Sequence, residues 1–167
     1  MARTSPAEDG LPRDYVGYGR NRPDPKWPDN ARIAVNINVA YEGGGERNVL
    51  DGDECSEGVL TDTGLPSAAG TRNPLVESSF EYGSRVGIWR LMRIFEQFDV
   101  TASMIAVATA LERNAEVCSA FVELGHEIVN HGHRWIDYVD VDEATEREHI
   151  RLSTESIERT TGVRPQG

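Results

Sequence analysis

Cysteine, long apolar runs and basic side chains are all scarce in this sequence. The two cysteines, Cys55 and Cys118, stand far apart and in no metal-ligand spacing, which is typical of a reducing compartment. Cys118 falls on an apolar helical face, so we expect a buried, inert thiol there. No apolar run approaches the roughly 18 residues of a membrane helix, and the first residues lack the apolar core of a secretory signal. We therefore expect a cytoplasmic protein with no membrane partner.

The charge balance also excludes nucleic acid as a partner. Acidic side chains outnumber basic ones by 28 to 17, which gives a formal net charge of -11. A polyanion would have to overcome the repulsive field of the whole molecule. With 38% hydrophobic and 27% charged residues, the chain of 167 residues has the composition of an ordinary globular protein with one buried core.

The N-terminal region differs in composition from the rest. Residues 1–30 hold more than half of the eight prolines, so no long helix or central strand can run through them. We expect an extended arm there that wraps the domain, with Tyr15, Tyr18 and Trp27 as anchors. The remaining residues, 31–167, are expected to form the N-terminal part of a domain that continues beyond this chain.

Apolar periodicity predicts alternating strands and helices after the arm. Strands are expected over residues 32–41, 100–107 and 127–130. Helices are expected over residues 84–98, 114–124 and 142–161, and a long loop over residues 43–79. This order predicts an α/β fold in which helices cover a parallel sheet. Three strands cannot close a (β/α) barrel, which usually takes about 250 residues, so we expect the front portion of a longer protein.

Polar residues gather where the first and third expected strands end. Glu42 is followed by three glycines and Glu46, and His131 follows the third strand. Reactive groups of parallel α/β folds collect at the carboxyl ends of the strands. We therefore expect Glu42 and His131 to face each other as an acid/base pair.

Several segments resemble the polysaccharide deacetylase family. The run at 124–132, LGHEIVNHG, resembles the segment that leads into the family's metal-binding histidine motif. Residues 41–44, YEGG, stand where the family has Phe-Asp-Asp-Gly, and residues 161–165, TGVRP, resemble its Thr-Gly-x-x-Pro run. The resemblance covers roughly residues 30–167. It implies a distorted (β/α) barrel of the polysaccharide deacetylase type, here truncated after about half of the barrel.

The chain is more similar still to the cofactor-independent allantoinase branch of that family. The similar segments are residues 15–23, 80–85 and 131–138. This resemblance implies a hydrolase of non-peptide carbon-nitrogen bonds that converts allantoin to allantoate in purine degradation. It also implies a homo-oligomer, a tetramer, that needs no cofactor.

Departures from the family's metal site support the expectation that no cofactor is needed. Glu42 keeps the position of the base and His131 that of the first histidine, but Gly43 and Trp135 replace the second carboxylate and the second histidine. One of three ligands is too few for a catalytic zinc site. In an extended segment His133 would project to the same side as His131, so one divalent ion such as zinc, held by both, stays an alternative. Gly43 departs from the allantoinase branch too, which has glutamate there.

The resulting mechanism needs no ion. Glu42, helped by His131, would deprotonate a water that attacks a ring amide of allantoin, and the protonated partner would supply the leaving nitrogen. The amides of residues 43–45 or the side chain of Arg134 are candidate oxyanion donors. Substrate contacts are assigned to Gly44, Glu46, Arg134, Trp135 and Tyr138.

Each assignment has a structural alternative. Glu46 would then be a solvated loop charge, and Trp135 would belong to the core. Arg134 would pair with Asp137 or Asp140. His126 and His149 are expected to be structural or surface residues.

Two other functions stay open from the sequence. One is a metal-dependent N-deacetylase of carbohydrate, either chitin or peptidoglycan. The other is a truncated barrel without activity, because the family's later arginine motif lies beyond Gly167. We expect residues 1–167 alone to be inactive.

Overall fold

The computed structural model describes residues 14–59, 61 and 64–167, and the chain divides into two units, Met1–Val35 and Asn36–Gly167. The described part of the first unit is exposed and contains one short 3-10 turn, η1 (Pro28–Asn30). The expected boundary between arm and domain, and the wrapping of the arm around the domain, stay predictions. No helix in the described part of the chain is long and apolar enough to cross a membrane.

The second unit is built on a parallel sheet of three strands in the order β1-β2-β3. The strands are β1 (Asn38–Tyr41), β2 (Ser103–Ala106) and β3 (Glu127–Asn130). In register, Tyr41 pairs with Ala106 and Ala106 with Asn130, so all three strands end in one row. This arrangement, and its coverage by helices, confirms the expected α/β class.

Two of the strands are shorter than the sequence predicts. The first begins at Asn38 rather than at residue 32, and the second spans four residues instead of eight. Because β2 begins at Ser103, it offers β1 few partners, and the pairing starts where the Ser103 amide donates to the Ile37 carbonyl. Ile33 and Val35, which alternate as a strand would, are 75% and 80% exposed. Alternation alone therefore overestimated the strand.

Local capping explains where the later helices begin and end. Helix α4 (Ala115–Glu123) starts at Asn114, whose side chain accepts from the Val117 amide. Helix α5 (Glu143–Thr161) starts at Asp142, which accepts from the Thr145 amide and hydroxyl, and stops at Gly162 in the left-handed conformation. Carboxylate and amide side chains satisfy the free amides of a first turn. The helices expected here are confirmed.

Three helical segments differ from the helices and the loop that the sequence predicts. Helix α1 (Pro74–Tyr82) lies partly within the expected loop, where the Asn73 side chain caps it and Pro74 occupies the first turn. A π-helical turn, η3 (Gly83–Gly87), continues directly into α2 (Ile88–Phe98). Helix α3 (Ala108–Arg113) was not predicted and follows β2 at once. The expected loop over residues 43–79 therefore ends at Asn73, and it contains a further 3-10 turn, η2 (Val49–Asp51).

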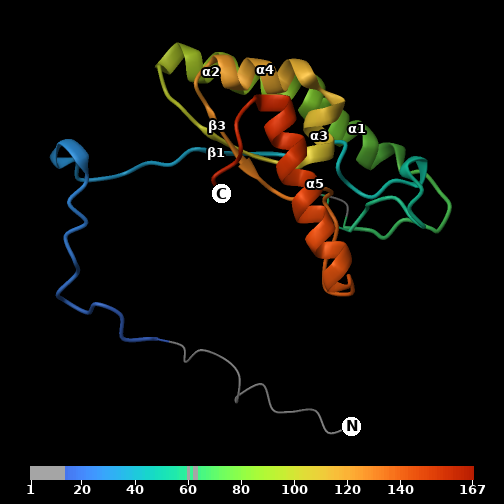
Figure 1. Cartoon of the computed structure of the whole chain (residues 1–167), viewed down its shortest axis with the longest axis horizontal. Helices are drawn as coiled ribbons and strands as arrows, with labels where there is room; N and C mark the ends of the chain where they lie inside the picture. The colour runs from blue at the N-terminus through green and yellow to red at the C-terminus, as the bar shows by residue number, and fades with distance from the viewer. Residues whose placement is uncertain (1–13, 60, 62–63) are drawn as a thin grey trace, which may run out of the picture. The chain divides into compact units, whose positions relative to one another are not determined.

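The core lies between the sheet and the helices that cover one of its faces. Tyr41, Met104 and Ala106 point toward the helices and are at most 4% exposed, whereas Ala40 and Ile105, on the other face, are less buried. Figure 1 shows α2 and α4 side by side, and α5 packs against α3, α4 and β3. Cys118 is 1% exposed within this core, which confirms the expected buried thiol.

Candidate active site

Glu42 and His131 meet at the carboxyl edge of the sheet. Each follows the last residue of an outer strand, and Val107 occupies the same row after the central strand β2. Because neighbouring strands lie about 4.8 Å apart, two long side chains can meet across one strand. The His131 Nε2 atom lies 2.9 Å from Glu42 Oε1, with the side chains 41% and 22% exposed. The expected juxtaposition is confirmed, while the catalytic roles stay predictions.

The three glycines after Glu42 form a tight turn. The Gly45 amide donates to the Glu42 carbonyl over 2.8 Å, and the Gly44 amide donates to Glu46 Oε2 over 2.6 Å. Gly44 has a φ of 99°, a conformation that side chains disfavour. Both amides are thus used inside the turn, which leaves neither as an oxyanion donor in this structure. Glu46 is 8% exposed, so it is no solvated loop charge.

Arg134 reaches across to the loop that follows β1. Its guanidinium contacts both carboxylate oxygens of Asp53, over 2.6 Å and 2.9 Å, and also donates to the Glu46 carbonyl over 3.2 Å. The expected partners, Asp137 and Asp140, were wrong. They were chosen for their nearness in sequence, whereas Asp53 is brought close by the path of the loop. Hydrogen bonding from Arg134 lowers the pKa of Asp53, and burial opposes this effect in part.

Trp135 packs against the core and also lines a cavity at the surface. Its amide donates to the Gly45 carbonyl over 2.8 Å, and its ring packs edge-on against Phe80 with the centroids 6.2 Å apart. The residue is partly buried against the core, as the structural alternative expected. It also lines a cavity of about 370 Å³ whose other lining residues are Arg47, Glu57, Val59, Ile136 and Asp137.

Tyr138 and two histidines form a cluster beside the site. The Tyr138 hydroxyl lies 2.8 Å from His149 Nδ1, and the rings of His133 and His149 are 5.3 Å apart. Burial lowers the pKa of His133, and the neighbouring His149 adds to this effect. His126, which is 9% exposed, accepts from the Ala102 amide through Nδ1, so its structural role is confirmed.

The side chains present do not fit the family's zinc site. His131 contacts Glu42, whereas the ring of His133 packs beside His149. A side chain at Gly43 would begin 2.8 Å from the Ser84 hydroxyl and 3.0 Å from the Phe80 carbonyl, so the missing carboxylate has little room. Among residues 14–59, 61 and 64–167, no three His, Cys, Asp or Glu side chains are grouped as metal ligands.

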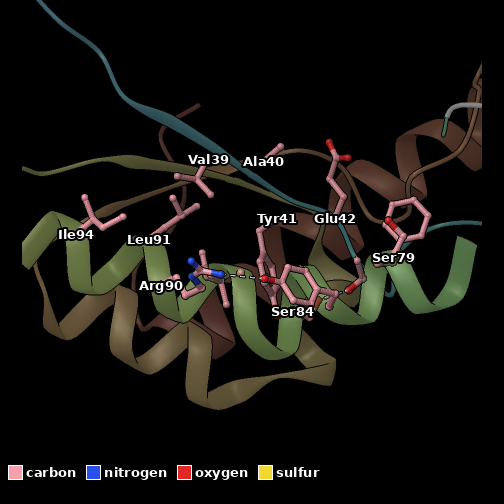
Figure 2. Close-up of a pocket in the computed structure, with 15 residues that line it drawn as sticks. Val39, Ala40, Tyr41, Glu42, Ser79, Ser84, Arg90, Leu91 and Ile94 are labelled. Carbon is pink, nitrogen blue, oxygen red and sulfur yellow. Dashed lines mark hydrogen bonds between the residues drawn. The ribbon is translucent and has the colours of Figure 1, made fainter. Parts of the chain in front are cut away.

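The cavity of about 510 Å³ beside β1 is lined by Glu42 and Gly43 as well as by residues of α1, η3 and α2. Figure 2 shows Tyr41 pointing among the helices from β1, while the Glu42 carboxylate points to the opposite side of the strand. Val39, Leu91 and Ile94 give this cavity apolar walls on the helix side. The Glu42 carboxylate, which contacts His131, therefore points away from these apolar walls, although Glu42 lines the cavity.

A second cavity, of about 400 Å³, lies behind the glycine turn. It is lined by buried polar groups of the loop and of α1, among them Glu46, Asn48 and Glu77. The Asn48 side chain donates through Nδ2 to Glu77, which also pairs with Arg72 over 2.6 Å. Asn48, Asp53 and Glu77 could not be predicted from the sequence, because nothing in the pattern of the loop shows where it folds back.

Comparison with known proteins places these features in one family. The polysaccharide deacetylase family model matches residues 68–167. A polysaccharide deacetylase of Schizosaccharomyces pombe is 41% identical over 153 residues, which cover 89% of this chain and 48% of that protein.

Solved structures agree. The crystal structure of the PuuE allantoinase superposes with a TM-score of 0.86 at 47% identity, covering 93% of this chain and 52% of that one. A polysaccharide deacetylase structure from Pseudomonas aeruginosa PAO1 gives a TM-score of 0.86 at 48% identity, with the same coverage of 93% and 52%. The chain thus spans about half the length of these relatives. It has the deacetylase fold and belongs to the polysaccharide deacetylase family.

Proposed function

We propose that the full-length protein is a hydrolase of non-peptide carbon-nitrogen bonds, an allantoinase that opens the ring of allantoin. The observation that carries this proposal is the contact between Glu42 and His131. The pair supplies an acid and a base, and the donor set around it does not fit a zinc ion. The similarity to the PuuE allantoinase supports the choice of substrate.

The mechanism uses both side chains. Glu42 contacts His131 through Oε1, so its second carboxylate oxygen, Oε2, lies outside this contact and can accept a proton from water. The water oxygen then bonds to a ring carbonyl carbon, and the bond from that carbon to the ring nitrogen breaks. The proton taken by Glu42 passes through His131 to the leaving nitrogen. Because water is the nucleophile, no covalent bond forms between the enzyme and the substrate.

The cavity at Trp135 is the proposed place for the flat substrate ring. Its volume of about 370 Å³ suits a small molecule, and Arg47 and Asp137 offer polar partners beside the indole. Neither Glu42 nor His131 lines this cavity, and the proposal links it to the catalytic edge through the hydrogen bond from the Trp135 amide to Gly45, in the turn that follows Glu42. Tyr138 contacts His149, and we propose that it supports the wall of this site rather than the reacting atoms.

The second candidate is a metal-dependent N-deacetylase of carbohydrate. It is favoured by the family model and by the similarity to the Pseudomonas aeruginosa deacetylase structure, which equals the similarity to the allantoinase. In that case the full-length protein would have to supply metal ligands from outside this chain.

Metal analysis and two substrates separate the candidates. The full-length protein, purified without added metal, is tested on allantoin and on N-acetylated chitin and peptidoglycan fragments, with and without a chelator. We expect turnover of allantoin that survives chelation and is lost in Glu42→Gln. Stoichiometric zinc together with chelator-sensitive deacetylation would refute the proposal.

The oligomeric state, the cellular location and the activity of this chain alone can also be tested. We propose that the full-length protein forms a homo-tetramer in the cytoplasm, which light scattering and fractionation would check. Because the chain spans about half the length of its relatives, we propose that residues 1–167 alone are inactive. Turnover of allantoin by this chain alone would contradict that expectation.

A further inference from the structure

Two loops meet at the catalytic edge, and an ion pair joins them. The loop after β1 carries Glu42, and the loop after β3 carries His131. Arg134, three residues after His131, holds Asp53 with two charge-assisted hydrogen bonds. The two side chains are 23% and 19% exposed, so water screens this pair less than an open surface pair.

The same guanidinium is linked to the turn beside Glu42. It donates to the Glu46 carbonyl, and the Glu46 carboxylate accepts from the Gly44 amide. The Gly45 amide in turn donates to the Glu42 carbonyl. These hydrogen bonds, joined through the backbone of residues 44–46, connect Arg134 to the backbone of Glu42.

Asp53 is itself fixed from the other side. Its carboxylate accepts from the Asn48 amide over 2.8 Å, and the Asn48 side chain donates to Glu77 on α1. Arg72 holds Glu77 in place. Asp53 is thus a rigid anchor that α1 supports, rather than a mobile loop acid.

We propose that the Arg134–Asp53 pair is a positioning device that sets the separation of Glu42 and His131. In this proposal Arg134 acts through the loop and not on the substrate, since three of its hydrogen bonds go to Asp53 and the Glu46 carbonyl. Bidentate pairing fixes orientation as well as distance, which a lysine at this position could not reproduce. The expected loss of turnover rests on the proposed function, whereas the expected change in the geometry of Glu42 and His131 does not.

The geometric test reads His131 directly. When Glu42 accepts from His131, the neutral ring carries its proton on Nε2, and ¹⁵N chemical shifts of the imidazole report that tautomer. In the full-length protein we expect Asp53→Asn and Arg134→Gln each to reduce the Nε2–H population. Arg159→Gln, which breaks an α5–α3 ion pair with Glu112, is the control and should leave it unchanged. An unchanged tautomer ratio in Asp53→Asn would overturn the proposal.

Kinetics separate positioning from substrate binding. We expect Asp53→Asn and Arg134→Gln to lower kcat by about 10- to 100-fold, as misplacement of a catalytic group does, with little change in KM. The double variant should be no worse than either single variant, because both break one device. A loss in Arg134→Gln that Asp53→Asn does not share would show direct substrate contact and overturn the inference.

One further variant and a folding control separate the possible outcomes of these experiments. Arg134→Lys keeps the charge but not the bidentate geometry, and we expect it to resemble Arg134→Gln; full activity in Arg134→Lys would contradict the role of bidentate pairing. Circular dichroism identifies any variant that fails to fold, in which case the isosteric Asp53→Asn decides. If the wild-type protein does not act on allantoin, the proposed function fails, but the tautomer measurement still tests the positioning pair.

Discussion

Replacing Gly45 with alanine tests how closely the glycine turn approaches the central strand. A Cβ at Gly45 would lie 2.5 Å from Cγ1 and 3.1 Å from Cβ of Val107, which is fully buried. Gly45 does not have a positive φ, so backbone strain adds nothing to this contact. Because Val107 is packed in the core, either the turn or the Val107 side chain must shift.

The size of the effect follows from overpacking. An extra methyl in a tightly packed site costs about 1–3 kcal/mol, and each kcal/mol lowers the Tm of a domain of about 150–250 residues by about 2–4 °C. We expect Gly45→Ala to lose stability in this range in thermal and urea unfolding. Since Gly45 is hydrogen-bonded to both Glu42 and Trp135, turnover by the full-length protein should fall as well.

Matched substitutions make the test specific. Gly83 has helical dihedral angles, and no atom lies within 4 Å of the place that an alanine methyl would take, so Gly83→Ala should stabilise the chain by about 0.5–1 kcal/mol. Val107→Ala should cost less stability when combined with Gly45→Ala than alone, because the new methyl fills the vacated space. Wild-type stability of Gly45→Ala, or additivity in the double variant, would refute the reasoning.

Three further outcomes are expected. Glu42→Gln should lower kcat of the full-length protein by about 10²–10⁴-fold without changing its circular dichroism spectrum, because the base is lost and the fold is not. Asp53, whose pKa is lowered from 3.8 chiefly by Arg134, stabilises the fold above pH 3.8 and loses this effect as the pH falls toward its folded pKa. The stability gap in urea between wild type and Asp53→Asn should therefore narrow below pH 3.8. Asn114→Ala should lower the unfolding free energy by about 1 kcal/mol, because the Val117 amide loses its cap.

The meeting of Glu42 and His131 could be predicted because it follows from topology. Parallel strands end at one edge, and each residue directly follows its strand. Helix α5 could be predicted as well, since Asp142 and Gly162 are local signals that act through neighbouring backbone groups. Both predictions depend on few residues that are close in sequence or fixed by strand order.

The partners within the long loop could not be predicted. Asp53 and Arg134 are 81 residues apart, and no periodicity or cap relates them. Helix α1 differs, since Asn73 and Pro74 stand in a loop-like composition although together they form a helix start. The first failure reflects tertiary structure, whereas the second reflects an overlooked local signal.

The loss of the family's metal ligands is a change in packing as well as in chemistry. Phe80 stands beside both altered positions, since its carbonyl lies 3.0 Å from a Cβ at Gly43 and its ring packs against Trp135. Trp135 is also hydrogen-bonded to Gly45, so the turn, α1 and the loop after β3 contact one another where the ligands would stand. Restoring a carboxylate at position 43 would therefore require the Ser84 hydroxyl to turn away and the Phe80 carbonyl of α1 to shift slightly. The metal-free interpretation of this edge thus depends on the position of a helix, not on two missing ligands alone.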